Sequence, residues 1–243
     1  SGGGTLSNSN DLVLNNAGSK LLLNSITVDS VSTSADNSGL DVDNNSTLSS
    51  LSVAHTTPLS IASGKTLSGA ITVTAGSIKL VEAGTLASTI TMSGGTLDSD
   101  NSSTLSGRLT QTGAITIDVA SGKTLTYSGA SLSLGAYTLT MSGGGTLSNS
   151  NVFVLNNASS KLLLNSITVD NVSTSLASLG LDVDADSTVT SLTVGHTTPV
   201  SIASSRTLSG AITVTAGSIK LDETGELAST ISMGGGTIDA DNS

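Results

Sequence analysis

Pairs of aspartates two residues apart have the clearest potential for chemistry in this sequence. Asp41 and Asp43 form one pair, and Asp98 and Asp100 form another. Both pairs recur later in the chain, where Asp186 adds a further carboxylate to the copy of the first pair. In an extended chain, residues i and i+2 project from the same face. Each pair therefore gathers carboxylate oxygens, which are the ligands that Ca²⁺ prefers.

Weak Ca²⁺ binding is one hypothesis for these carboxylates, and solvated charges that keep the protein soluble are the favoured one. The segments lack the central glycine and distal glutamate of an EF-hand loop. They also lack the Gly-Gly-x-Gly-x-Asp pattern of Ca²⁺-binding nonapeptide repeats. No other metal or cofactor is expected. The candidate ligands are Asp41, Asp43, Asp98, Asp100, Asp182, Asp184, Asp186, Asp239 and Asp241.

The histidines and serines form no recognisable catalytic set. His55 and His196 are copies of one position before Thr-Thr-Pro, which suggests an exposed turn rather than a metal site. No Gly-x-Ser-x-Gly elbow occurs. A polysaccharide lyase or hydrolase would need clustered carboxylates, usually with a basic residue, and often aromatic platforms for the sugar, but Arg108 is alone in its region. We predict that the chain is not an enzyme.

Thr-x-Thr triplets suggest a different activity, because flat rows of stacked threonines can match an ice lattice. Such a row must persist on every successive turn of a repeat. Steps of 19 residues from Thr72 and Thr74 reach Thr91 but then Ser93, so the row is kept only in part. The tendency of threonine to form strands is the simpler explanation.

Composition excludes several classes of protein. The net charge is −10 in 243 residues, which disfavours nucleic acids and anionic membrane surfaces as partners. The absence of cysteine rules out disulfides and thiolate metal sites. No apolar run approaches the roughly 18 to 20 residues of a membrane span, so we expect no membrane insertion. Aromatic residues make up only 1% of the chain, so Leu, Ile, Val and Ala must fill the interior.

Internal repetition explains this composition. Residues 1–10 recur letter for letter at 142–151, and about three quarters of the positions match through to the end of the chain. We therefore divide the chain into a first long unit, 1–141, and a second, incomplete copy, 142–243, within one continuous solenoid. A shorter period of about 20 residues gives about seven turns per long unit. It is marked by Thr-Leu pairs that end at Leu48, Leu67, Leu86, Leu105, Leu125 and Leu147.

Short alternating segments identify the element that repeats. In residues 65–80, Lys-Thr-Leu, Ala-Ile-Thr-Val-Thr and Ser-Ile-Lys-Leu alternate polar with apolar, with Gly69 and Ala75-Gly76 as expected corners. No helical periodicity persists. The pattern predicts an all-β fold, a right-handed parallel β-solenoid of about twelve turns with inward aliphatic ladders. A β-sandwich is the structural alternative, but it does not explain the phased period.

Residues 64–80 and their copy at 205–221 resemble the passenger-associated repeats of autotransporters and giant tandem-repeat surface proteins of Gram-negative bacteria. The Tyr- and Thr-rich centre common in such repeats is replaced here by Ala70-Ile-Thr-Val73. The resemblance implies export, a bacterial cell-surface location and a stalk, adhesin or fibre role. It transfers no catalytic residue.

We expect a structural and adhesive segment of an extracellular fibre, which associates with like chains end to end or laterally and contacts surface glycans or a partner cell. The alternative is a solenoid face that binds glycan or ice. Neither end of the sequence resembles a solenoid cap, and the chain does not begin with Met. We therefore expect a fragment of a longer parent protein.

Overall fold

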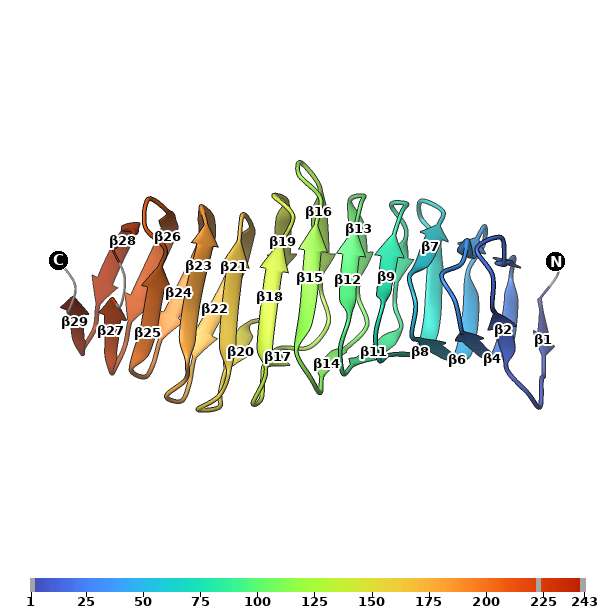
Figure 1. The fold of residues 1–243 in the computed structure, drawn as a ribbon, viewed down its shortest axis with the longest axis horizontal. Coiled ribbons are helices and arrows are strands. Elements are labelled where there is room, and N and C mark those ends of the chain that lie inside the picture. The colour runs from blue at the N-terminus through green and yellow to red at the C-terminus, as the bar shows by residue number, and fades with distance from the viewer. Residues whose placement is uncertain (1–2, 222–223, 241–243) are drawn as a thin grey trace.

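The computed structural model describes residues 3–221 and 224–240, and it confirms the predicted fold class. Strands are the regular elements throughout these residues, and they coil into a parallel β-solenoid (Figure 1). Two sheets run the length of the coil. In Figure 1 the 12-stranded sheet faces the viewer with its strands pointing upward, while the chain advances from right to left. That combination makes the coil right-handed, the usual hand of parallel crossovers.

The 12-stranded sheet, here called sheet B, contributes one strand to each turn, so the solenoid has 12 turns. Its strands in chain order are β3 (Lys20–Leu23), β5 (Gly39–Val42), β7 (Thr57–Ile61), β9 (Ser77–Leu80), β12 (Thr96–Ser99), β15 (Ile115–Val119), β18 (Thr138–Ser142), β21 (Lys161–Asn165), β23 (Gly180–Ala185), β25 (Thr198–Ile202), β27 (Ser218–Leu221) and β29 (Thr237–Ala240).

The 17-stranded sheet, here called sheet A, contributes to each turn either one long strand or a leading and a trailing strand. Strand β8, for example, pairs with both β10 and β11 of the next turn. The strands are β1 (Gly4–Leu6), β2 (Leu12–Leu14), β4 (Ile26–Thr33), β6 (Ser46–Val53), β8 (Thr66–Val73), β10 (Thr85–Leu86), β11 (Thr89–Met92), β13 (Ser103–Leu105), β14 (Leu109–Gln111), β16 (Thr124–Tyr127), β17 (Leu132–Ser133), β19 (Thr146–Asn149), β20 (Phe153–Leu155), β22 (Thr168–Thr174), β24 (Ser187–Val194), β26 (Thr207–Val214) and β28 (Glu226–Met233).

Aliphatic side chains of successive turns stack in columns inside the solenoid, as the sequence predicts. On sheet B, Ile78 pairs with Leu97, and Leu97 pairs with Ile117. All three are at most 1% exposed. Because side chains alternate between the two faces of a strand, the polar residues between them face outward. Each turn thus buries its apolar face against the turns on either side, which is the main source of stability in a solenoid.

The two aromatic residues that lie in the core sit at the centre of the rod. Tyr127 and Phe153 are buried and stack with ring centroids 5.7 Å apart. The Tyr127 hydroxyl donates a hydrogen bond of 2.6 Å to the carbonyl oxygen of Ala130 and accepts one of 3.3 Å from the amide of Leu109. The phenol is therefore satisfied although it is buried, as such groups must be.

Glycine positions correct one detail of the sequence analysis. Gly69 lies inside β8 and not at a corner between strands. Its φ is +124°, and a Cβ there would lie 1.6 Å from the carbonyl oxygen of Leu48 on the previous turn. Gly69 is therefore needed for close approach of two backbones. Gly76, predicted at a corner, does lie between β8 and β9.

Within the residues that the structure describes, there is no helix with the length and apolarity required to cross a membrane.

Candidate functional site

Lysine–aspartate ion pairs link neighbouring turns on the outer face of sheet B. Lys20 Nζ lies 2.8 Å from Asp41 Oδ2, and the repeat copies Lys161 Nζ and Asp182 Oδ2 are 2.5 Å apart. These pairs join β3 to β5 and β21 to β23, which are adjacent strands of the sheet. The long units thus carry the same cross-turn pair at the same place.

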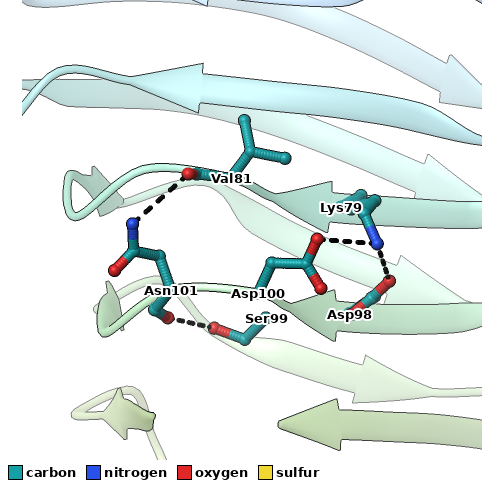
Figure 2. Close-up of polar contacts among 6 residues, drawn as sticks. All are labelled: Lys79, Val81, Asp98, Ser99, Asp100 and Asn101. Atoms are coloured by element: carbon teal, nitrogen blue, oxygen red, sulfur yellow. Dashed lines mark hydrogen bonds and ion pairs between the residues drawn. The ribbon is translucent and has the colours of Figure 1, made fainter. Parts of the chain in front are cut away.

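The most connected ionic site lies between β9 and β12. Lys79 Nζ is 2.9 Å from Asp98 Oδ2 and 2.8 Å from Asp100 Oδ2, so one ammonium group bridges two carboxylates (Figure 2). Register explains the contact, because Lys79 pairs directly with Asp98 across the two strands. Asp100 follows β12 and returns to the same ammonium group. The structure therefore does bring Asp98 and Asp100 together, as the spacing predicts.

Hydrogen bonds just beyond β12 hold Asp100 in place. Asn101 Nδ2 donates to the carbonyl oxygen of Val81 at 3.4 Å, which ties this corner to the previous turn (Figure 2). The hydroxyl of Ser99, which is buried, donates to the carbonyl oxygen of Asn101 at 2.8 Å. These bonds fix the backbone on both sides of Asp100 and direct its carboxylate toward Lys79.

The protonation equilibria reflect this crowding of charges. Hydrogen bonds to Asp100 and Asp98 raise the pKa of Lys79 to about 12. Partial burial raises the pKa of Asp98 above its ordinary value, in spite of the opposing effect of Lys79. Asp100 and Asp118 add to that rise by repulsion. Asp118 follows Asp98 in the register of sheet B, and its carboxylate accepts a hydrogen bond from the Ser142 hydroxyl.

The remaining candidate Ca²⁺ ligands are spread along the rod. Asp186 Oδ1 accepts a hydrogen bond of 3.0 Å from the amide of Thr207. Asp239 pairs in register with Lys220, whereas Asp241 lies outside the described residues. Asp43 and Asp184 follow the ion-paired Asp41 and Asp182. Over residues 3–221 and 224–240, no three His, Cys, Asp or Glu residues are grouped so that they could hold a metal ion.

The lysines are the part of this site that the sequence analysis missed. Each of these ion pairs joins a lysine to an aspartate 19 or 21 residues later: Lys79 to Asp98, Lys20 to Asp41 and Lys161 to Asp182. That separation is one turn of the solenoid. A search for opposite charges one turn apart would have found the pairs. The Ca²⁺ hypothesis stays a prediction, and it now requires that the ion compete with a lysine ammonium group.

The histidines take part in corner structure. The hydroxyl of Thr57 donates to the carbonyl oxygen of His55 at 3.1 Å, and that of Thr198 donates to the carbonyl oxygen of His196 at 2.9 Å. The His55 side chain is half-buried, and His196 is exposed. Both stand just before a sheet B strand, β7 or β25, which agrees with the turn predicted from Thr-Thr-Pro.

A column of hydroxyl-bearing residues runs along the outside of sheet A. We call it the hydroxyl column: the last outward residue of the trailing segment in successive turns. Register aligns its members directly, for instance Ser52 with Thr72 and Thr72 with Thr91. Val13 stands before its first member, Ser32, and Val154 interrupts it between Ser133 and Ser173. Its members are Ser32, Ser52, Thr72, Thr91, Thr110, Ser133, Ser173, Thr193, Thr213 and Ser232.

This column differs from the rows considered in the sequence analysis. Thr74, which the sequence analysis took as a member of the row, lies just beyond the end of β8, and another Thr-x-Thr triplet, Thr138-Leu-Thr140, lies on β18 of sheet B. The partner of Thr72 across the outer face is therefore Ala70, two residues before it, and not Thr74. Counting Thr-x-Thr triplets in the sequence mixed residues from two faces.

Comparisons with family models, with curated proteins and with solved structures found no match to this chain. The class of the protein is therefore defined by its own geometry, that of a 12-turn parallel β-solenoid. That fold is compatible with structural roles and with binding roles.

Proposed function

We propose that this chain is a structural and adhesive segment of an extracellular fibre, in the manner of the autotransporter-like surface proteins of bacteria that its repeats resemble. Its mechanical part is the rod, and its adhesive part is self-association with like chains. Contacts of the rod with surface glycans or with a partner cell would add to that adhesion. Repeat number would set the length of the rod.

The observation that carries this proposal is the continuity of sheet B. Its 12 strands form a single ladder, with one strand for every turn. Each turn is hydrogen-bonded to the next along the long axis, so adding a turn lengthens the rod without changing its cross-section. Such a design suits a spacer better than it suits a single enclosed binding site.

Side chains reinforce the same axis. Asn149 and Asn171, on adjacent turns, exchange hydrogen bonds from each side-chain amide to the other's backbone carbonyl, at 2.8 and 2.6 Å. The Lys–Asp pairs of sheet B also connect one turn to the next. Bonds of this kind oppose separation of neighbouring turns, as amide ladders do in stacked β structures.

In the first and last turns that the structure describes, apolar side chains are exposed next to strand edges that have no partner strand among the described residues. Val13 is 48% exposed and Leu22 64% exposed at one end, while Ile238 is 44% exposed at the other. Exposed strand edges of this kind readily pair with another chain. For this stretch of chain taken alone, they favour end-to-end association, which is the adhesive step that we propose.

Small-angle X-ray scattering and negative-stain microscopy over a range of protein concentrations test this proposal, with and without Ca²⁺. Twelve turns at about 4.8 Å each span about 55 to 60 Å. We expect longer rods as concentration rises. Ile238→Lys, which places a charge on the edge strand β29, should suppress that growth. Leu176→Lys is the matched control, since Leu176 is 50% exposed on a corner between β22 and β23. Rods of constant length at every concentration would overturn end-to-end association.

The hydroxyl column supports a second candidate function, binding of an ordered surface such as ice or a crystalline glycan. Its residues repeat at about 4.8 Å along the axis, which is the spacing of neighbouring strands. Thermal hysteresis and ice-shaping measurements test it, with Thr193→Lys on the column and Thr116→Lys on sheet B as the control. Equal behaviour of the two variants would exclude the column as the binding surface.

A further inference from the structure

A shallow groove recurs at the same place in both long units. The groove of the second unit has a volume of about 260 Å³, and that of the first about 320 Å³. Eight of the nine residues that line the first groove have their counterparts, 141 positions later, in the lining of the second. The two hollows are therefore one site present twice, on the edge of the rod where the chain passes from sheet B to sheet A.

Short corners create the hollow. Only residues 24–25 separate β3 from β4, and only 166–167 separate β21 from β22. Further along the rod, the corners between β7 and β8 and between β25 and β26 are four residues long, 62–65 and 203–206. In each unit the corners at the groove are shorter than the one that follows them along the rod, and this difference leaves a gap in the outer wall of the solenoid.

A serine in the left-handed conformation closes each short corner. Ser25 has a φ of +53° and Ser166 a φ of +57°. A residue other than glycine pays about 1–2 kcal/mol for this conformation. Glycine would relieve that strain, yet serine stands at both positions. Strained residues that persist are often found at functional sites, so the observation directs attention to what the serine hydroxyl does there.

Hydroxyl groups at the floor of the groove are held by hydrogen bonds within the protein, while those at its rim are available to a ligand. Ser187, 5% exposed, donates a hydrogen bond of 2.8 Å to the carbonyl oxygen of Ala185 and accepts one of 3.3 Å from the amide of Ile167. Ser46 makes the equivalent bonds in the first groove. By contrast, the hydroxyls of Ser166 and Thr168 make no hydrogen bond within the part of the chain that the structure describes.

Charge distinguishes the two grooves. Asn45 in the first is replaced by Asp186 in the second, and the Oδ1 atom of each accepts a bond of 3.0 Å from a backbone amide, that of Thr66 or of Thr207. The second oxygen of Asp186 is thus a charged acceptor, which forms stronger hydrogen bonds than a neutral amide. The net charge of −10 opposes binding of an anionic ligand.

We propose that each groove binds one neutral sugar residue of a glycan, through the free hydroxyls of Ser25 and Thr27 in the first unit and of Ser166 and Thr168 in the second. The volume is that of a small-ligand site at the lower end of the usual range, about 300 Å³. A sugar offers several hydroxyl groups to these donors and acceptors. The second groove binds more tightly, because Asp186 accepts a charge-assisted bond from the ligand. The inference does not depend on the fibre function, since a passive rod could carry the same sites.

Two-dimensional NMR titration with the methyl glycosides of glucose, galactose, mannose and N-acetylglucosamine tests the proposal on the intact chain. We expect at least one of them to shift the amides of residues 25–27 and 166–168 in a saturable manner. Ser166→Gly should abolish saturation at the second groove and leave the first unchanged, because glycine keeps the left-handed backbone while it removes the hydroxyl. Asp186→Asn should lower the affinity of the second groove to that of the first.

Ser205→Gly is the matched control, because Ser205 is also left-handed, with a φ of +62°, yet lies in one of the longer corners and lines neither groove. It should leave both titrations unchanged. Absence of saturable shifts with all four glycosides would overturn the proposal. So would an equal loss in Ser166→Gly and Ser205→Gly, or shifts that follow the hydroxyl column instead of the grooves.

Discussion

The corner before β5 and its copy before β23 have the same backbone and different side chains. In the first, Asn37 is buried, and its amide nitrogen donates to the Ala35 carbonyl at 3.1 Å and to the Thr57 hydroxyl at 3.2 Å. Its side-chain oxygen accepts a bond of 2.8 Å from the amide of Gly39. In the second, Ser178 takes this position, and its buried hydroxyl has no partner among the described residues.

The backbone nevertheless follows the same path in both corners. The amide of Ser38 donates to the carbonyl of Ser19 at 2.9 Å, and that of Leu179 donates to the carbonyl of Ser160 at 3.0 Å. The comparison shows that the path of the backbone is set by the columns of core residues and by backbone hydrogen bonds between turns. Corner side chains can then diverge, and Leu179 is accordingly 56% exposed.

The largest effect should come from a core residue whose copies differ in burial. Leu162→Ala should cost about 2–5 kcal/mol of unfolding free energy, because Leu162 is fully buried between turns. Leu21→Ala, the same change in the first unit, should cost less, because Leu21 lies on the end strand β3 and is only half-buried. Urea denaturation followed by circular dichroism measures both. Equal losses would show that burial at the end turn matches that in the interior.

A glycine substitution should act alike in both units. Gly39→Ala and Gly180→Ala should each destabilise the protein by about 1–3 kcal/mol, because both residues have positive φ. An added Cβ would also lie 1.8 Å from the carbonyl oxygen of Pro58 or 1.9 Å from that of Pro199. The control is Gly64→Ser, which has open space and copies the natural Ser205. Clearly different melting temperatures of Gly39→Ala and Gly180→Ala would contradict a shared backbone conformation in the two corners.

Placing the same residue in both corners, by Asn37→Ser or by Ser178→Asn, should make the corners energetically alike. Asn37→Ser should lower stability by about 1 kcal/mol, the typical net value of a hydrogen bond. Ser178→Asn should raise it, because the amide can bond as Asn37 does. Denaturant midpoints of the single and double variants give the comparison. A stability gain from Asn37→Ser would show that its three hydrogen bonds do not hold the corner.

The smallest effect should be electrostatic and dependent on pH. Lys79→Met should cost at most about 1 kcal/mol at neutral pH, as is usual for partly exposed pairs. Without Lys79, the pKa of Asp98 should rise further, so the folded state binds this proton more tightly than the unfolded state does. The difference in unfolding free energy between Lys79→Met and the unsubstituted protein should therefore become smaller as pH falls through the folded pKa of Asp98. Lys20→Met is the control, since within the described residues Lys20 forms an ion pair with one carboxylate, that of Asp41. A pH-independent loss would contradict this account.

In the unsubstituted protein, the ion pairs of Lys79 make stability depend on pH at the alkaline end of the scale. Its folded pKa of about 12 exceeds the ordinary lysine pKa of 10.5 that applies to the unfolded chain, so its contribution is complete below pH 10.5 and is lost as pH rises toward 12.

The sequence was sufficient for the fold class and for the inward face. Alternation within residues 65–80 placed Leu67, Ile71 and Ile78 in the core, because side-chain direction in a strand depends only on local position. Contacts between turns depend also on the length of each corner. Corner lengths decide that Lys79 meets Asp98 and that Ser52 aligns with Thr72, and no local pattern reveals them. The division into units at residue 141 stays a prediction from sequence identity.

The left-handed serines illustrate the same limit. Ser25 and Ser166 look like any other serine in a serine-rich chain, because positive φ is a property of the corner and not of the residue type. Only the equivalence of Gly64 and Ser205 offered a hint, since a glycine replaced by serine marks a position where both residues adopt the left-handed backbone.

The parallel pairing of the strands has a consequence for assembly. Because every turn from β3 to β29 points the same way round the axis, the rod is polar, and its two ends are different surfaces. A second rod that continues the parallel register can join only head to tail. Such heterologous contacts do not close on themselves unless a rotation brings the chain into a ring. The solenoid advances along one axis and supplies no such rotation, so the end-to-end assembly that we propose would be directional and open-ended, and it would stop only where a different surface covers the last strand.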